Sequence, residues 1–403
     1  MWEQWPFNRS FDVRCLGFVN SQPANVVPDD NRLASFLNRS VEVPMSLVVD
    51  HDAFQTLVRT LHEIPEPDSA SEWPSAQMDL LAEAGGLRWN IPRAFGGQDV
   101  DAVEMLEIYR ELAAGSLLTT FILTQRNAAC QRIETSANRA LAARLLPALC
   151  SGELFATVGI SHLTTSRQHV QSPVVLVTEV PEDRGYRLNG LIPWATGAAQ
   201  ADILVSGGTL NDGSQLLAAI PMNRDGVVVD KPLSLMGLSS SQTSAVELKD
   251  VLVSYEEILH GPVDRVMSAG SGGGAGSPGT SAVAIGTAQG TLKMFAEEVD
   301  QRPELAEFLT PLEHEATELI YQLRLAATGT SGPAVCSAEV IRQRANSMVL
   351  RSAQAWLAAT KGAGFLAGHP AERAVRESMF FLVWSCPQPV LEANLRELAC
   401  VIN

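Results

Sequence analysis

The segment from Gly185 to Val253 constrains the fold of this chain more than any other stretch. Short apolar runs follow one another here, and turn sequences such as Asn211-Asp212-Gly213 separate them. No segment long enough for a crossover helix intervenes, so the sheet that these runs form should be mostly antiparallel. The predicted strands are residues 174–180, 201–205, 215–221 and 227–229, followed by an alternating stretch around Val246.

Helical periodicity lies on both sides of this β-rich segment. Apolar residues recur at three-to-four spacing from about Asp52, and the helix predicted from Asp101 begins with an Asp-x-x-Glu pattern typical of a capping box. Beyond the β-rich segment, helices are expected at 305–323, about 338–360 and 371–383. The chain is therefore predicted to be an α+β multidomain protein, with an N-terminal helical bundle, a middle antiparallel β-domain and a C-terminal four-helix bundle.

Changes in composition place the expected boundaries of these parts. A Gly/Ser-rich loop is expected where the run 268–281 has too much glycine and serine to pack. Residues 1–44 fit nothing downstream, and their composition favours an upstream start-codon artefact over a native extension. The predicted parts are the extension 1–44, the N-terminal helical domain 45–154, the middle β-domain 155–262, the loop 263–281 and the C-terminal helical domain 282–403.

The composition narrows the class of protein. With 403 residues, 46% of them hydrophobic, the chain is long enough for several well-packed domains. A formal net charge of −16 argues against a nucleic-acid partner or an anionic membrane surface, because either needs a basic face. The six cysteines show no metal-ligand spacing and suit a reducing compartment. No apolar run is long enough for a membrane span, so a cytoplasmic protein without a metal site is expected.

Five strings follow one another along the chain: GGLRWNIPRAFGGQ (85–98), LLPALCSGE (145–153), YRLNG (186–190) followed by WATGAAQAD (194–202), MGLSSSQTSAVELKDVLV (236–253) and KGAGFLAGHPAERAVRES (361–378). In this order they resemble landmarks of the acyl-CoA dehydrogenase family, flavoproteins that oxidise thioesters. Each string is weak alone, but together they cover roughly residues 82–390. The resemblance implies that fold, oxidoreductase activity on a small-molecule substrate such as an acyl thioester, and a homodimer or homotetramer. It implies FAD as cofactor, with FMN or no cofactor as alternatives.

The resemblance also implies where a flavin would bind. It places Trp194 against the isoalloxazine ring and the hydroxyl of Thr196 near the reactive ring nitrogen. A flat apolar wall and a hydrogen-bond donor two residues apart on a strand suit a flavin ring, although a core tryptophan beside a surface threonine is the plain alternative. At the glycine turn that holds the adenine arm in the family, Gly362 and Gly364 persist.

Other cofactor positions depart from the family pattern. The first flavin strand reads GISHLTTSR and has lost a glutamate, a proline and a glycine, yet Ser161 and Thr164 still offer hydroxyls to a pyrimidine edge or a substrate. His162 is either a chemical group or a polar residue at a domain junction. Val299 stands where the family has an arginine for the diphosphate, which leaves Arg302 as a shifted substitute.

The largest departure is at the catalytic base, because Ser385 occupies the position of the family's glutamate. A serine cannot remove the α-proton of a thioester unaided, so the catalytic residues stay unknown. Carboxylates on the helix after the β-domain are the alternative bases, although they are equally explained as a solvated helix face. These carboxylates are Glu297, Glu298 and Asp300.

Three interpretations of the function remain open at this point. The first is a flavin-dependent monooxygenase, in which reduced flavin and oxygen react without a carboxylate base. The second is dehydrogenation of an acyl-CoA by a relocated base. The third is a non-catalytic binding or scaffold protein that kept the architecture and lost the site. The step from fold to any of these functions is analogy.

Overall fold

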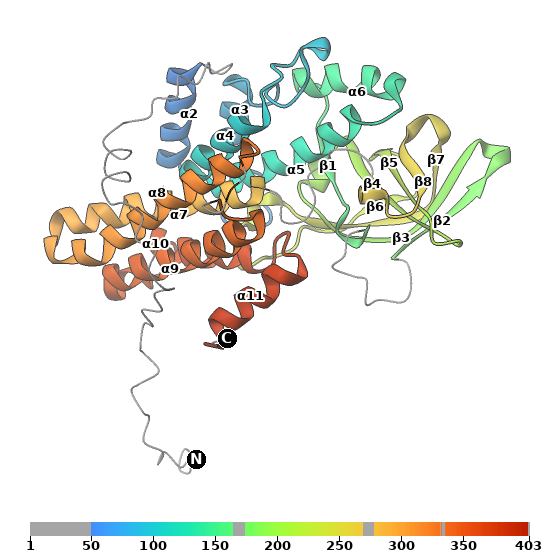
Figure 1. Cartoon of the computed structure of the whole chain (residues 1–403). Helices are drawn as coiled ribbons and strands as arrows, with labels where there is room; N and C mark the ends of the chain where they lie inside the picture. The colour runs from blue at the N-terminus through green and yellow to red at the C-terminus, as the bar shows by residue number, and fades with distance from the viewer. Residues whose placement is uncertain (1–49, 164–173, 269–277, 331, 333–334, 402–403) are drawn as a thin grey trace. The chain divides into compact units, whose positions relative to one another are not determined.

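The computed structural model describes residues 50–163, 174–268, 278–330, 332 and 335–401, and it has the predicted order of helices, sheet and helices (Figure 1). The extension predicted at 1–44 lies outside the described residues. None of the helices in the described ranges is both long and apolar enough to cross a membrane.

The N-terminal helices begin at side-chain caps that the sequence contains. Asp50 caps the first of them, and the Asp101 carboxylate accepts the amide hydrogens of Val103 and Glu104 at 2.9 Å. The predicted start at Asp101 is thus confirmed. The helices are α2 (His51–Glu63), α3 (Ser75–Glu83), α4 (Ala102–Gly115), α5 (Leu117–Glu134) and α6 (Arg139–Ser151).

The middle segment forms one sheet of eight strands in the order β6-β7-β3-β2-β4-β5-β8, with β1 beside β4. Most pairs are antiparallel, but β4 runs parallel to both β1 and β2, so the sheet is mixed rather than wholly antiparallel. The reason is that β3 already pairs with β2 and β7, which forces β4 to the free edge of β2. The strands are β1 (Ala156–Val158), β2 (Val175–Val180), β3 (Gly185–Ala195), β4 (Ile203–Leu210), β5 (Gln215–Pro221), β6 (Val227–Val229), β7 (Ser244–Ser254) and β8 (Ile258–Val263).

The C-terminal helices differ from prediction at two ends. The loop expected up to residue 281 is shorter, because a helix already begins at Pro278, a residue suited to the first helical turn. The helix expected at 371–383 ends at Ser378 and continues as a 3-10 turn, Met379–Leu382. The helices are α7 (Pro278–Gln301), α8 (Ala306–Ala327), α9 (Ala338–Gly364), α10 (Pro370–Ser378) and α11 (Gln388–Leu398).

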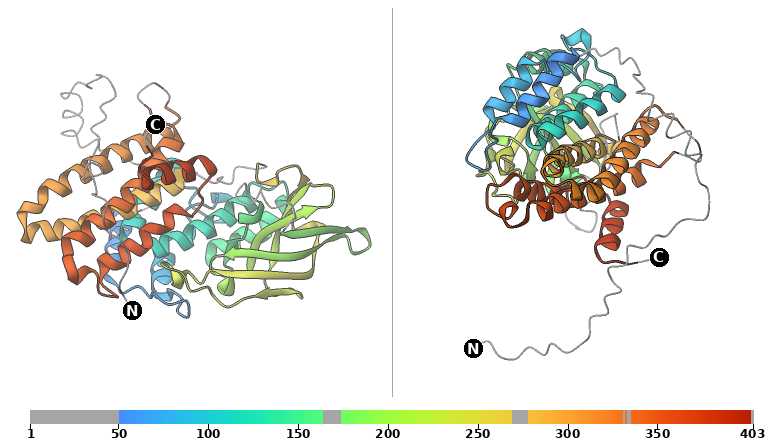
Figure 2. Two further views of the ribbon diagram at one scale, coloured as in Figure 1. Left: turned by 90° about the horizontal axis from the view of Figure 1, so that it is seen from below. Right: turned by 90° about the vertical axis from the view of Figure 1, so that its left-hand side faces the viewer.

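Helix α7 lies among the other helices and packs against α4, α8 and α9 (Figure 2). Two glycines one turn apart, Gly286 and Gly290, let it approach α4 closely. A Cβ atom at Gly286 would collide with the carbonyl oxygen of Arg110, and one at Gly290 with that of Ala114. The crossing of α4 and α7 therefore requires glycine at these positions.

Replacing Gly286 by alanine should destabilise the fold. The added methyl group must push α7 away from the α4 backbone, a form of overpacking that costs about 1–3 kcal/mol. Urea unfolding followed by circular dichroism would measure the change. Gly362→Ala is the matched control, since nothing lies within 4 Å of a Cβ at that position. Equal unfolding midpoints for the two variants would contradict this account.

Candidate functional site

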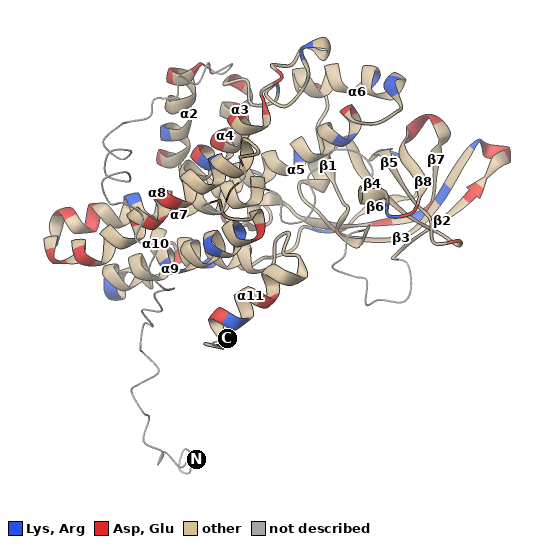
Figure 3. Cartoon of the chain, in the orientation of Figure 1, with Lys and Arg blue, Asp and Glu red and all other residues tan. Residues whose placement is uncertain are grey.

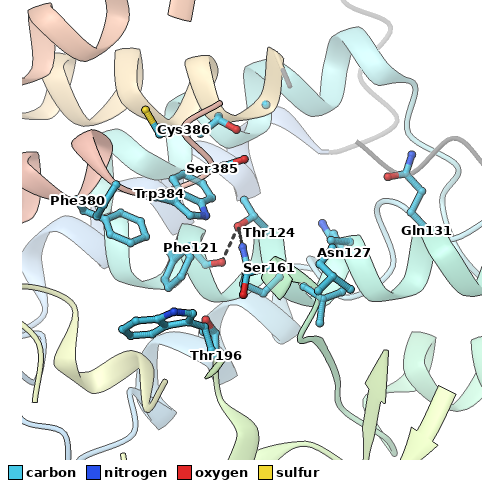
Figure 4. Close-up of a pocket in the computed structure, with 18 of the residues that line it drawn as sticks. Phe121, Thr124, Asn127, Gln131, Ser161, Thr196, Phe380, Trp384, Ser385 and Cys386 are labelled. Atoms are coloured by element: carbon cyan, nitrogen blue, oxygen red, sulfur yellow. Dashed lines mark hydrogen bonds between the residues drawn. The ribbon is translucent and has the colours of Figure 1, made fainter. Parts of the chain in front are cut away.

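A cavity of about 1600 Å³ lies where the three parts of the chain meet (Figure 4). Helices α4 and α5 supply one side, the ends of several strands supply another, and the segment 379–387 after α10 closes it. Of the predicted site residues, the structure brings Ser161, Trp194, Thr196 and Ser385 together at this cavity. Thr164 lies outside the described residues.

Trp194 and Thr196 stand at the end of β3, where the pairing with β7 is irregular between Ile192 and Ala195. Such a bulge turns a strand and re-aims its side chains. The Trp194 side chain is 49% exposed and lines the cavity, so it is not a core tryptophan. Thr196 is buried, and its hydroxyl oxygen lies 3.2 Å from that of Thr243.

Ser161 and His162 follow β1 on a short 3-10 turn, Ser161–Leu163, and both line the cavity. The His162 ring Nε2 lies 2.9 Å from the carbonyl oxygen of Gly207 on β4. This contact holds the imidazole against the sheet. His162 therefore has a structural contact and also lines the cavity.

An aromatic wall borders Ser385 in Figure 4. It consists of Phe121 on α5 and of Phe380 and Trp384 after α10. The Phe380 and Trp384 rings stack at 5.1 Å between centroids, and the Phe121 ring meets Trp384 edge-on at 5.3 Å. Ser385 follows directly with a backbone φ of 47°, a left-handed conformation that few non-glycine residues adopt. Sequence reasoning missed this wall, because Phe121 and Trp384 are distant in the chain.

No aspartate or glutamate lines the cavity among the residues that the structure describes. Residues 164–173 and 269–277, which lie outside the description, contain no acidic residue in the sequence either. Acidic residues are marked along helices such as α2 and α8 and near the turns between strands (Figure 3). Three cations, Arg132, Arg265 and Arg376, do line the cavity, and two of them pair with carboxylates outside its lining, Arg265 with Asp264 and Arg376 with Asp68.

The alternative bases on α7 do not reach this cavity. Glu297, Glu298 and Asp300 are not among its lining residues, and Glu298 pairs with Arg302 at 2.5 Å. Arg302 also donates to the carbonyl oxygen of Ala359 at 2.8 Å. The guanidinium that was expected as a shifted diphosphate ligand is therefore engaged within its own bundle.

The predicted glycines of the adenine arm lie apart from Trp194. Gly362 is exposed and Gly364 is buried at the end of α9, after a break at Lys361, whose φ is 56°. Neither glycine lines the cavity. The structure thus brings the ring-binding candidates together and leaves the adenine-arm candidates at a separate place on the same chain.

A network of ion pairs behind the cavity joins α10 to the segment after α2. Arg376 lines the cavity, donates to the carbonyl oxygen of Met236 at 3.0 Å and pairs with Asp68 at 2.6 Å. One turn earlier, Arg373 pairs with Glu66 and with the buried Glu377. Because Met236 also lines the cavity, this network fixes part of its wall.

The largely buried Glu66 should make stability depend on pH. Burial raises the pKa of Glu66 to about 7 from its ordinary 4.5, although Arg373 opposes the shift. The folded chain then binds more protons than the unfolded chain between pH 4.5 and 7, so stability falls as pH rises through this window. In Glu66→Gln this fall should be smaller.

Urea unfolding at about pH 5 and about pH 7 would measure this difference. Glu63→Gln, which changes an exposed carboxylate at the end of α2, is the matched control. An unchanged difference between the two pH values in Glu66→Gln would show that Glu66 does not titrate in this window.

Comparison with known proteins shows similarity in sequence and in fold. Residues 50–153 match the family described as acyl-CoA dehydrogenase, N-terminal domain. The chain is 28% identical to a dibenzothiophene monooxygenase of Rhodococcus erythropolis, over 49% of this chain and 48% of that protein. It is 29% identical to an isobutylamine N-hydroxylase of Streptomyces viridifaciens, over 52% and 56% respectively. The chain spans about half the length of these curated relatives.

Among solved structures, the glutaryl-coenzyme A dehydrogenase–glutaryl-CoA complex superposes with a TM-score of 0.72. The identity is 20%, and the match covers 86% of this chain and 94% of that one. At this identity the likeness concerns the fold alone, and it extends through all three parts of the chain.

Proposed function

We propose that this chain, a divergent member of the acyl-CoA dehydrogenase family, is a flavin-dependent oxidoreductase that uses oxygen chemistry rather than thioester dehydrogenation. The observation that carries the proposal is a cavity without a carboxylate among its described residues, lined by both Trp194 and Ser385. Removal of an α-proton from a thioester in this family's manner needs a carboxylate within hydrogen-bond reach, and none lines the described part of the cavity.

The relatives support the same class. Two proteins that share about 28–29% identity with this chain are named as a monooxygenase and an N-hydroxylase. A reaction of that class transfers oxygen to the substrate and requires no carboxylate at the position of Ser385. The substrate is proposed to be a small molecule that fits between the aromatic wall and Trp194.

The cavity fits the ring of a flavin. The half-exposed Trp194 offers a flat face, and Thr196 and Ser161 bring hydroxyl groups to the same cavity. A bound flavin would supply the redox chemistry, and these residues would hold and orient its ring.

The chain offers fewer binding residues to the diphosphate of FAD than to the flavin ring. Val299, at the family's arginine position, packs against the helical core, and Arg302 is paired with Glu298. We therefore propose that contacts with the isoalloxazine ring supply most of the binding free energy. FMN should then bind about as tightly as FAD. The exposed Phe365 beside Gly362 is consistent with the predicted homodimer or homotetramer, in which a second copy would complete the arm.

Trp194→Ala should weaken flavin binding about tenfold, because the ring loses its stacking partner. Fluorescence quenching of FMN and FAD would measure the two dissociation constants. Phe308→Ala, which truncates an exposed aromatic residue on α8 outside the cavity, is the control. Equal flavin affinity in wild type and Trp194→Ala would contradict the assigned ring site.

The reaction class can be tested with the wild-type chain. Mixed with reduced FMN or FAD, the chain should accelerate oxygen consumption. Under anaerobic conditions, butyryl-CoA should not bleach the flavin bound to the chain. Rapid bleaching would show that a carboxylate elsewhere acts as base, and failure to bind either flavin would favour the non-catalytic interpretation.

Ser385→Glu should lower oxygen-dependent turnover, because it places a charge beside the aromatic wall.

A further inference from the structure

Three polar side chains beneath the cavity form a hydrogen-bonded series that ends at Tyr109. Arg126 on α5 donates from Nη1 to Oδ1 of Asn127 at 3.0 Å. Asn127 donates from Nδ2 to the Tyr109 hydroxyl oxygen on α4 at 2.9 Å. Asn127 and Tyr109 both line the cavity, and Figure 4 shows Asn127 at its side near Gln131.

Arg126 carries a buried positive charge without a carboxylate partner in the described part of the chain. Its side chain is 1% exposed, and besides Asn127 it donates to the carbonyl oxygen of Leu149 at 2.6 Å and to Asn90 at 3.4 Å. The neighbouring Cys130 thiol does not offset this charge, since burial raises its pKa. A charge with only neutral partners extends its field further than one in an ion pair.

The guanidinium fixes the direction of the whole series. A guanidinium has only donors, so Asn127 must turn its oxygen toward Arg126 and its NH₂ group toward Tyr109. Asn90 Nδ2 holds the same stretch of α5 through the carbonyl oxygen of Asn127 at 3.0 Å. The Tyr109 oxygen accepts the bond from Asn127, which leaves the single hydroxyl hydrogen for another acceptor.

The described residues do not provide that acceptor. The only hydrogen bond of the Tyr109 hydroxyl within the described ranges is the one it accepts from Asn127. Burial raises the pKa of Tyr109 to about 12, so the hydroxyl keeps its proton at neutral pH. Tyr109 is thus a neutral donor at the cavity wall, with a positive charge two side chains behind it.

We propose that Tyr109 donates a hydrogen bond to a ligand oxygen that carries negative charge inside the cavity, and that Asn127 and Arg126 are the residues that position and polarise it. The inference rests on the proposed function, because flavin reduction and oxygen transfer both place such charge on a ligand. The oxygen belongs either to the reduced flavin or to the substrate. In both cases the site resembles an oxyanion hole, in which a donor is oriented before the charge develops.

Two variants remove this donor by different routes. Tyr109→Phe deletes the hydroxyl and keeps the ring. Asn127→Asp keeps the size of the side chain, but the new carboxylate pairs with Arg126 and accepts the Tyr109 hydrogen, which is then withdrawn from the cavity. Tyr255→Phe is the matched control, because it also deletes a hydroxyl with one hydrogen bond, to Glu179 at 2.8 Å on the β-domain surface.

Two binding measurements distinguish the source of the oxygen. The first compares the affinity for oxidised FMN and for anaerobically reduced FMN. The second follows the absorption maximum of 4-nitrophenolate, an aromatic oxyanion, added to the flavin-loaded chain. Loss of a hydrogen bond to a charged group should weaken binding of the responsible ligand about tenfold or more.

A selective loss for reduced FMN in both cavity variants would support the flavin as the source. A selective loss of 4-nitrophenolate affinity and of its spectral shift would support the substrate. Unchanged values for both ligands in Tyr109→Phe, with wild-type oxygen consumption intact, would overturn the inference and leave the proposed function standing. If the wild type binds no flavin, the proposed function fails, and 4-nitrophenolate binding to the flavin-free chain would still test Tyr109.

Discussion

The close crossing of α7 over α4 is the constraint on which the rest of the structure depends. Gly286 and Gly290 bring the two helix backbones into contact, and no larger side chain fits between them. Helix α4 ends at Gly115 and α5 begins at Leu117, so the position of α4 also sets that of α5. Both helices form one side of the cavity. The shape of the cavity therefore depends on the α4–α7 crossing, which lies outside it.

The segment after α10 closes the cavity with packed aromatic rings. Phe380 and Trp384 stack on each other and contact Phe121, so aromatic carbon fills the space beside Ser385. The left-handed backbone at Ser385 is held by this packing, since the conformation costs free energy that the neighbours must offset. Ser385 thus directly follows a packed aromatic wall.

The sequence predicted features that depend on local pattern. The strands and the cap at Asp101 follow from residues close together in the chain, whereas Trp194 and Thr196 were singled out by the family resemblance. The parallel neighbours of β4 could not be predicted in this way, because they result from which strand edges are already occupied.

The aromatic wall and the series from Arg126 to Tyr109 were missed for a related reason. Periodicity indicates that a helix is amphipathic but does not say which turn of α4 faces which turn of α5. Tyr109 and Asn127 look like ordinary positions on two helices until the tertiary structure brings them within 2.9 Å. The buried Arg126 carried a signal, since an arginine among apolar residues on a helix needs a partner.

The electrostatics of the cavity connect these observations. A carboxylate that removes a proton must stay ionised, and a neighbouring anionic ligand raises the free energy of that state. In this chain the described cavity residues include no carboxylate, and within the described ranges the buried Arg126 has only neutral hydrogen-bond partners. The proposal under which this cavity stabilises negative charge on its ligand rests on that arrangement, since donors oriented by the fold need not reorganise when the charge develops. Under the proposed function, the uncharged Ser385 and the buried cation Arg126 both favour a ligand that becomes anionic during the reaction.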